Sequence, residues 1–252
     1  MPRVRLDLLL VARGLAPSRE RARALILAGG VQVSGVPAAK AGALVDDSAE
    51  IALRTPDHPW VGRGGIKLAH ALKTFGVDPA GLTVLDIGAS TGGFTDVLLT
   101  GGARRVVALD VGHGQLDWRL RTDPRVVVIE RLNARYLRAE DLPIDVRSFG
   151  LVTIDVSFIS LRQILPVVPS LLEPGGRVVA LVKPQFEAGK DEVGPGGIIR
   201  DPGIHARVVE EMTREAHRIG LERVALEPSP VTGVEGNKEF FLLFTSRSTP
   251  CP

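Results

Sequence analysis

The amino-acid sequence predicts an α/β fold in which an open, mostly parallel sheet of the Rossmann kind follows a small N-terminal α+β domain. Three observations lead to this prediction. Aliphatic runs alternate with helical patterns from residue 81 onward, as in a doubly wound sheet. Residues 83–94 read as a buried strand, an acidic residue, a glycine-rich turn and the start of a helix. A different pattern, two short helices followed by short strands, occupies residues 1–55.

The composition is that of a globular protein, with 44% hydrophobic and 24% charged residues among 252. No apolar run approaches the roughly 18 residues of a membrane-spanning helix, and residues 6–12 lack the features of a signal peptide. We therefore expect a cytoplasmic protein with no membrane partner. The single cysteine, Cys251, excludes an intramolecular disulfide and a cysteine-built metal site, and we expect no metal. The sequence carries no signal for an oligomeric state.

The charge is unevenly distributed along the chain, although the net value is only +2. Residues 1–40 hold seven Lys/Arg against two Asp/Glu, whereas the remainder holds 24 against 27. A basic head on a mildly acidic body is typical of a protein whose head contacts a polyanion.

The basic head contains two predicted helices and several short strands. The first helix spans residues 6–12 and ends before Gly14. Ser18 is the expected N-cap of the second, which ends at the glycine pair 29–30. Residues 31–33 alternate as a short strand, and residues 45–53 supply further strand material.

This pattern resembles the S-four domain, an RNA-binding domain named after a ribosomal small-subunit protein. The matching motifs are Arg-Leu-Asp at 5–7, Ser-Arg-Glu-Arg-Ala at 18–22 and Gly-Val-Gln-Val-Ser-Gly at 30–35. The resemblance implies that the start of the second helix lies on structured RNA, where arginines and a helix N-terminus suit phosphate oxygens. A solvated arginine face is the alternative. The RNA-binding candidates are Arg3, Arg5, Ser18, Arg19, Arg21, Arg23 and, beyond the domain, Arg63.

A proline-containing stretch, residues 56–61, is the expected linker between a domain at 1–55 and a second at 62–252. Trp60, at its end, suits a packing anchor better than a base-stacking platform. A glycine-rich run then leads into a helix over residues 66–75. Lys67 lies near the start of this helix, where the helix dipole disfavours a cation, so a functional role explains it better than stability does.

The glycine-rich turn is the first candidate for cofactor binding. Asp86 is expected to end the first strand, and Gly88, Gly92 and Gly93 let the backbone approach a ligand closely. The spacing differs from the Gly-x-Gly-x-x-Gly of pyrophosphate-binding turns, and a carboxylate in front would repel pyrophosphate. The carboxylate suits the cationic amino group and sulfonium of S-adenosylmethionine. An ordinary tight turn between a strand and a helix would show a similar sequence.

The next strands add candidate cofactor contacts at their carboxyl ends. The run 105–109 ends in Asp110, which lies 24 residues after Asp86 and is placed to hold ribose hydroxyls. The third strand, 126–129, leads to Asn133, a candidate partner for the adenine edge. The full cofactor-binding set is Asp86, Gly88, Ala89, Ser90, Thr91, Gly92, Gly93, Phe94, Asp110, Val111, Asn133 and Asp155.

The remaining pattern completes the sheet. A fourth strand spans 151–154, and a helix is expected to continue from the residues after it to residue 172. A fifth strand spans 177–182, and the glycine-rich loop 189–201 looks mobile. An amphipathic helix over 202–219 precedes two last strands, 222–226 and 240–245, of which the final one is expected to be antiparallel.

Four ionisable residues fall at element ends that face one edge of this sheet: Lys67, Asp155, Lys183 and Glu239. A ribose 2′-hydroxyl is a poor nucleophile, and an amine that is desolvated or lies beside a second ammonium can accept its proton. Lys67 beside Lys183 would lower the pKa of Lys183 by charge repulsion, and the two acids would orient the amines. Positioning of the hydroxyl in line with a methyl group is the other expected contribution.

Lys-Asp-Lys-Glu on such a sheet resembles the FtsJ-type ribose 2′-O-methyltransferases. Together with the S-four head, three motifs are similar to the TlyA family: Asp-Ile-Gly-Ala-Ser-Thr-Gly-Gly-Phe-Thr, Lys-Pro-Gln-Phe-Glu and Gly-Asn-Lys-Glu-Phe. The resemblance implies a class I methyltransferase fold and S-adenosylmethionine-dependent methylation of cytidine 2′-hydroxyls in ribosomal RNA, 23S and in some members 16S. It places the catalytic tetrad on the four residues named above. Gly62 departs from relatives that have Ser there, and the short tail resembles the form that modifies 23S alone.

Three other functions compete with this reading. An NAD-dependent oxidoreductase would need a turn suited to pyrophosphate and leaves the basic head unexplained. A non-catalytic ribosome-binding factor with the same fold would have a damaged cofactor turn or tetrad, and neither is damaged here. A haemolysin-like protein would need a membrane-active segment, for which no candidate exists in the sequence.

Overall fold

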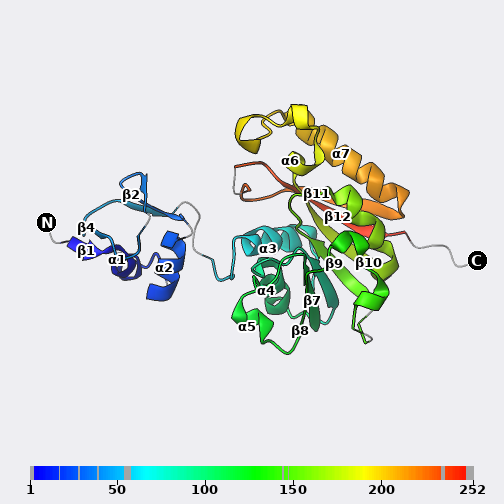
Figure 1. Cartoon of the computed structure of the whole chain (residues 1–252), viewed down its shortest axis with the longest axis horizontal. Helices are drawn as coiled ribbons and strands as arrows, with labels where there is room; N and C mark the ends of the chain where they lie inside the picture. Colours follow the sequence, from blue (N-terminus) through cyan, green and yellow to red (C-terminus); the bar gives the residue numbers. More distant parts are fainter. Residues whose placement is uncertain are drawn as a thin grey trace, which may run out of the picture. The chain divides into compact units, whose positions relative to one another are not determined.

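The computed structural model describes residues 3–16, 18–27, 29–38, 40–53, 58–143, 145–146, 148–233 and 236–247, without the side chains of residues 20, 21, 24 and 27. The chain divides into two compact units, Met1–Pro59 and Trp60–Pro252 (Figure 1). Residues 56 and 57 of the predicted linker, Cys251 and the Arg21 side chain lie outside the described part.

The small unit packs two helices against short strands. Strand β1 (Arg3–Arg5) pairs with β4 (Leu44–Asp46), and β2 (Val31–Val33) lies between β3 (Val36–Pro37) and β5 (Ile51–Leu53). Helices α1 (Leu6–Ala12) and α2 (Arg19–Leu27) form where they were predicted. The core is formed by buried aliphatic side chains, which are Leu6, Leu10, Ala16, Ala22, Ile26 and Val31.

Residues 45–53 form two strands in different sheets rather than one stretch of strand. Asp46 accepts hydrogen bonds from the backbone and the hydroxyl of Ser48, at 2.9 and 2.6 Å, and so fastens a turn between β4 and β5. The sequence pattern did not predict β1, because three residues are too few to show an alternation.

Asp7 joins the two helices of the small unit. Its buried carboxylate accepts hydrogen bonds from Arg5 at 3.0 and 2.9 Å and from Arg19 at 2.9 Å. These hydrogen bonds, first from Arg5 and then from Arg19, hold the pKa of Asp7 well below its usual range. Both guanidinium groups are therefore held in place at the surface of the unit.

The larger unit contains a seven-stranded sheet of order β11-β12-β10-β9-β6-β7-β8. The strands are β6 (Thr83–Ile87), β7 (Arg105–Asp110), β8 (Val126–Glu130), β9 (Phe149–Ile154), β10 (Leu172–Val182), β11 (Leu221–Pro228) and β12 (Phe240–Ser246). Only β12 runs antiparallel to its neighbours within this sheet. The predicted fold class, a mostly parallel sheet with an antiparallel last strand, is confirmed.

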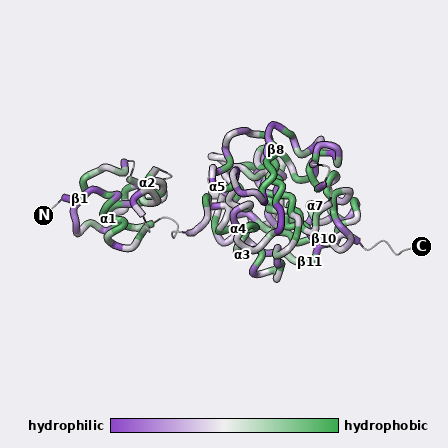
Figure 2. Tube along the Cα trace, turned by 90° about the horizontal axis from the view of Figure 1, so that it is seen from below, coloured by the Kyte–Doolittle hydropathy of each residue, from purple (hydrophilic) through white to green (hydrophobic). Residues whose placement is uncertain are grey.

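Helices and turns cover both faces of the sheet. Helices α3 (Gly64–Phe75), α4 (Gly93–Thr100) and α5 (Trp118–Arg121) pack on one hydrophobic cluster. Helix α7 (Pro202–Arg218) packs on the other. Successive residues of β6, such as Val84 and Leu85, belong to opposite clusters. Because both faces are covered, the central strands are nearly continuously hydrophobic (Figure 2).

The prediction of a helix after β9 is wrong. Three 3₁₀ turns stand there instead: η3 (Leu161–Gln163), η4 (Leu165–Val167) and η5 (Pro169–Leu171). Pro166 and Pro169 lack the N–H groups that an α-helix needs, so the segment breaks into short turns. Two more 3₁₀ turns follow β8, η1 (Ala134–Tyr136) and η2 (Ala139–Asp141).

The loop 189–201, which the sequence led us to expect to be mobile, contains two 3₁₀ turns, η6 (Lys190–Glu192) and η7 (Pro195–Gly197). The buried side chain of Asn237 fastens it, accepting from the Ile199 amide at 2.9 Å and donating to the Gly197 carbonyl at 2.8 Å. The short helix α6 (Pro184–Glu187) connects β10 to this loop.

Asp7→Asn tests the role of the buried carboxylate in the small unit. We expect a loss of about 2 kcal/mol at neutral pH, because hydrogen bonds to a charged acceptor are weakened. Because the pKa of Asp7 is lower in the folded than in the unfolded protein, its carboxylate stabilises the fold at pH values above the unfolded pKa of about 3.9. This contribution is lost as the pH falls further. The difference between the variant and the original protein should therefore begin to shrink below about pH 4 and should close only as the pH falls through the much lower folded pKa. Hydrogen exchange of the α1 amides at pH 7 and pH 3 measures this, and an equal difference at both values would contradict it.

Candidate active site

The glycine turn after β6 is shaped by backbone contacts that leave no room for side chains. Gly88 has φ +86°, and a Cβ there would lie 2.3 Å from the carbonyl oxygen of Asp155. Gly92 has φ +99°, and its Cβ would lie 2.2 Å from a methyl carbon of Leu120. Both positions therefore require glycine. The turn brings the end of β6 directly against the end of β9.

Asp86 occupies a different place from the one predicted. Strand β6 continues to Ile87, so Asp86 lies inside the strand, and it has no exposed surface. Its carboxyl accepts hydrogen bonds from Thr95 at 2.7 Å and Thr153 at 2.9 Å. Burial raises the pKa of Asp86 to about 7, against the opposing effect of these two hydroxyls. Its position is beneath the turn, where it ties β6 to α4 and β9.

Asp110 links the next loop to the glycine turn. It ends β7, as predicted, and its carboxylate accepts from the Ser90 amide at 2.8 Å and from the Gly112 amide at 2.7 Å. Ser90 itself has φ +49°, a left-handed conformation that this hydrogen bond helps to hold. Two consecutive strand ends are thus joined by one acid.

A cavity of about 710 Å³, here called the strand-end cavity, opens at the carboxyl ends of β6, β7, β8 and β9. Of the predicted cofactor residues, those that line it are Gly88, Ser90, Asp110, Val111, Asn133 and Asp155. The others do not line it; among these, Ala89, Gly93 and Phe94 are buried. Asn133 uses its side-chain oxygen to cap η1 by accepting from the Arg135 amide at 3.0 Å.

The residues that line the cavity suit an adenosyl group. The glycine at position 88 lets backbone and ligand approach, Asp110 offers acceptors for ribose hydroxyls, and Asn133 lies after the third strand. Its volume is within the range of small-molecule sites.

The four ionisable residues come together as two buried ion pairs. Lys67 Nζ lies 2.5 Å from Glu239 Oε2, and Lys183 Nζ lies 2.6 Å from Asp155 Oδ1. Lys67, Lys183 and Glu239 are at most 9% exposed. The register of β10 and β12 pairs Val182 with Phe240, so the next residues, Lys183 and Glu239, stand opposite each other at the sheet edge.

The two acids lie against the two amines, as the sequence led us to expect. Each ammonium is held by its own acid, and Lys183 additionally donates to the Ser157 hydroxyl at 2.8 Å. Burying two charges is costly even when they are paired, so such pairs are poor stabilisers. Two of them at one ligand-facing edge indicate a chemical role instead.

Sequence reasoning missed two residues beside the pairs, Ser157 and Phe158. Phe158 is 92% exposed, has φ +65° and packs its ring against that of Phe186 at 5.1 Å between centroids. It lines the strand-end cavity next to Asp155. The sequence signal was the motif Ser-Phe-Ile-Ser-Leu at 157–161, which is shared with the TlyA family but had been given no role in the site.

The loop that carries Phe158 is held by Glu187 of α6, the short helix that follows β10. Glu187 accepts from the Ser160 hydroxyl at 2.5 Å and from the Leu161 amide at 2.7 Å. Burial raises the pKa of Glu187, with these hydrogen bonds opposing the shift. The exposed Phe158, with its strained backbone, is therefore carried by a loop that hydrogen bonds hold in place.

The predicted RNA-contacting residues lie in both units. In the small unit, Arg3, Ser18, Arg19 and Arg23 are exposed, and Arg5 is half-buried beside Asp7. Arg63 belongs to the larger unit, where it donates to the Thr232 carbonyl at 3.1 Å. Among the described residues, no cluster of three or more metal-ligating side chains is found. The same residues include no helix that is long and apolar enough to cross a membrane.

The family comparisons agree with the fold. The FtsJ-like methyltransferase model matches residues 60–246, and the S4 domain model, the S-four domain above, matches residues 4–51. The larger unit is thus an FtsJ-like methyltransferase domain. A solved S-adenosylmethionine-dependent methyltransferase from Mesorhizobium loti is similar in fold alone, with a TM-score of 0.55 at 18% identity over 74% of this chain and all of that one.

Closer relatives cover nearly the whole chain. It is 49% identical to the 16S/23S rRNA (cytidine-2'-O)-methyltransferase TlyA of Mycobacterium tuberculosis, over 95% of this chain and 89% of that protein. It is 39% identical to Hemolysin A of Brachyspira hyodysenteriae, over 96% and 99%. A Streptococcus thermophilus structure described as a hemolysin superposes with a TM-score of 0.77 at 43% identity, over 99% and 90%. The chain belongs to the TlyA family.

Asp86→Asn tests the buried carboxyl. Because the folded pKa is raised to about 7, its stabilising contribution is complete below the unfolded pKa of about 3.9 and is lost as the pH rises towards 7. The original protein should lose up to about 4 kcal/mol over this interval relative to the variant. Urea unfolding at pH 4 and pH 8 measures the difference. Asp78→Asn, at an exposed acid, is the control, and a parallel pH dependence in both variants would refute the assignment.

Proposed function

We propose that the protein is an S-adenosylmethionine-dependent methyltransferase that transfers a methyl group to the ribose 2′-hydroxyl of a cytidine in ribosomal RNA. The observation that carries the proposal is the meeting of two buried lysine–acid pairs at the ligand edge of the sheet, beside a glycine-cradled cavity. The names of the M. tuberculosis relative and of the Campylobacter jejuni 23S rRNA (cytidine-2'-O)-methyltransferase TlyA, which is 33% identical over 73% of this chain and 70% of that protein, support it. Both names include 23S rRNA, which we take as the principal substrate.

The strand-end cavity is the proposed site for S-adenosylmethionine. Asp110 would hold the ribose hydroxyls, Asn133 the adenine edge, and Gly88 would give the backbone room to approach. When bound, this cofactor supplies a methyl group on a good leaving group, so the protein need not activate the donor. The task left to the chain is to place the hydroxyl and to remove its proton.

Lys183 is the proposed acceptor of that proton, in its amine form. Asp155 at 2.6 Å and the Ser157 hydroxyl at 2.8 Å fix the position of its Nζ. Lys67, fixed by Glu239 at 2.5 Å, would orient the hydroxyl from α3. Fixed positions supply much of the rate, because the reacting atoms are already aligned. The exposed face of Phe158 is available for an unpaired base.

The small unit is the proposed grip on folded ribosomal RNA, with the large subunit favoured. Arg5 and Arg19 are already oriented by Asp7, so less freedom is lost when they bind phosphates. A substrate made in the cytoplasm places the protein there.

A methyl-transfer assay tests the proposal. Ribosomal subunits from cells that lack the gene are incubated with protein and S-adenosylmethionine labelled on the methyl group, and the modified nucleotide is then mapped. Label on a cytidine ribose is expected. Cofactor binding without any transfer to ribosomal RNA would instead favour the non-catalytic ribosome-binding factor.

Lys183→Ala should lower the transfer rate by at least about 100-fold, because loss of a positioned acid or base costs this much. Binding of S-adenosylmethionine, followed by thermal stabilisation, should change little. Lys73→Ala, at an exposed lysine of α3, is the matched control. Unchanged turnover in the Lys183 variant would remove its assigned role.

Arg19→Ala with Arg23→Ala, one turn apart on α2, should weaken RNA binding and reduce its salt dependence. Two lost phosphate contacts lower the slope of log affinity against log salt by about 1.5 to 2. The control is Arg214→Ala with Arg218→Ala, a pair of equal spacing on α7. Equal salt slopes for both double variants would exclude α2 from the RNA interface.

A further inference from the structure

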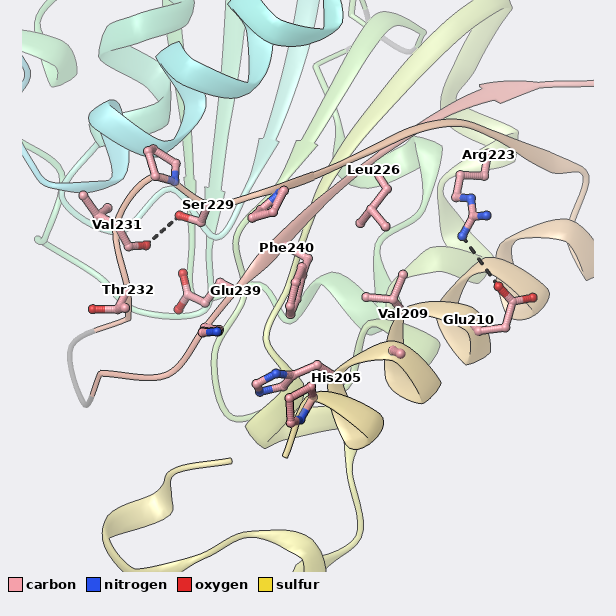
Figure 3. A pocket seen from close by; sticks show the side chains of 15 residues that line it. His205, Val209, Glu210, Arg223, Leu226, Ser229, Val231, Thr232, Glu239 and Phe240 are labelled. Carbon is pink, nitrogen blue, oxygen red and sulfur yellow. Dashed lines mark hydrogen bonds and ion pairs between the residues drawn. The ribbon is translucent and has the colours of Figure 1, made fainter. Parts of the chain in front are cut away.

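A second cavity, here called the α7 cavity, has a volume of about 660 Å³ and lies between α7, β11 and the segments 228–232 and 238–240 (Figure 3). Its lining comprises Pro202, His205, Ala206, Val209, Glu210, Arg223, Leu226, Pro228, Ser229, Pro230, Val231, Thr232, Lys238, Glu239 and Phe240. None of the proposed cofactor residues lines it.

The α7 cavity and the strand-end cavity both reach the lysine–acid pairs. Glu239, the partner of Lys67, lines the α7 cavity, whereas Asp155, the partner of Lys183, lines the strand-end cavity. The four charged side chains therefore lie between two spaces of similar size. Group transfer needs a donor and an acceptor on either side of the reacting groups, and the strand-end cavity takes the donor.

The lining of the α7 cavity suits a nucleobase. Val209, Leu226 and Phe240 form apolar walls, and the Phe240 ring lies 5.6 Å from that of His205. Flat apolar walls of this kind accept the face of an unstacked base. Ser229 and Thr232 add polar edges, as specific small-molecule sites require.

The rim of the α7 cavity carries positive charge where a phosphate would pass. Lys238 is exposed at the rim, next to Glu239. Arg63 reaches the same rim by donating to the carbonyl of Thr232 at 3.1 Å. At the far end Arg223 lies 3.6 Å from Glu210, so its charge is balanced there. Cationic groups thus lie towards the reacting edge, where an RNA backbone enters.

The floor next to Glu239 is firmly built. A Cβ on Gly233 would lie 2.6 Å from Glu239 Oε1, so the backbone packs directly on that carboxylate. The Ser229 amide donates to the Glu239 carbonyl at 2.8 Å. The cavity wall is therefore in direct contact with Glu239, and a ligand in the cavity would lie against that residue.

We propose that the α7 cavity binds the base of a nucleotide that flanks the acceptor in the same RNA strand. This rests on the proposed function. The base of the acceptor itself has the exposed ring of Phe158 on the opposite, cofactor side. With one base at Phe158 and a neighbour in the α7 cavity, the ribose between them is held at the two lysine–acid pairs.

Filling the cavity tests the proposal. Ala206→Trp places a large ring into the cavity from an exposed position on α7, and Thr232→Trp does so from the opposite wall if the first variant fails to fold. Arg214→Trp, an exposed residue of α7 outside the lining, is the control. The probe is the 23S rRNA, with RNA binding measured by filter retention beside the kinetics of methyl transfer.

We expect the filled variants to raise both KM and Kd for the RNA at least tenfold, with S-adenosylmethionine binding within twofold of the original. The control should match the original protein. RNA affinity unchanged in both filled variants would overturn the proposal, as would a change in molecular mass on gel filtration in place of a change in RNA affinity, which would indicate a protein occupant.

Abasic RNA identifies the occupant. Once the acceptor nucleotide has been mapped, removing the base on one of its two sides should weaken binding to the original protein and leave binding to Ala206→Trp unaffected. Equal losses in both proteins would overturn the proposal. If the original protein binds the RNA yet transfers no methyl group, the proposed function fails, whereas the RNA affinities of the filled variants, measured by filter retention, still report on the cavity.

Discussion

The close approach of β6, β9 and β10 at their carboxyl ends is the constraint on which the candidate site depends. Gly88 lets the Asp155 carbonyl come within the space of a side chain, and the Asp155 amide in turn donates to the Ile87 carbonyl at 2.9 Å. Without that approach Asp155 would not stand where Lys183 can reach it from the end of β10. The ion pair is therefore a consequence of sheet register.

The antiparallel last strand brings in the second pair. Because β12 runs opposite to β10, its amino end meets the carboxyl end of β10, and Glu239 arrives at the same edge as Lys183. Lys67 then reaches Glu239 from α3, on the face covered by α3 and α4. A wholly parallel sheet of the same length would leave Glu239 at the opposite edge, far from the other three.

Three polar side chains beneath the site have hydrogen-bond partners that hold them in place. Asp86, Asn237 and Glu187 are each tied by two hydrogen bonds to segments distant in sequence. Such bonds stabilise little in net terms, but leaving a buried polar group unpaired is costly. They therefore select one arrangement of the loops around the strand ends. In the small unit the buried carboxylate of Asp7 likewise fixes two arginine side chains through hydrogen bonds.

Local pattern was enough to predict the parallel strands, α1 and the end of β7 in Asp110, because each depends on hydrophobic period and on glycine placement within a few residues. Motifs on separate strands also indicated that Lys67, Asp155, Lys183 and Glu239 share an edge. Tertiary structure alone decided that Lys67 pairs with Glu239, that Asp86 is enclosed beneath the turn, and that Phe158 stands exposed in a strained loop. Those outcomes depend on register and on contacts between segments tens of residues apart, for which a single sequence has no period to read.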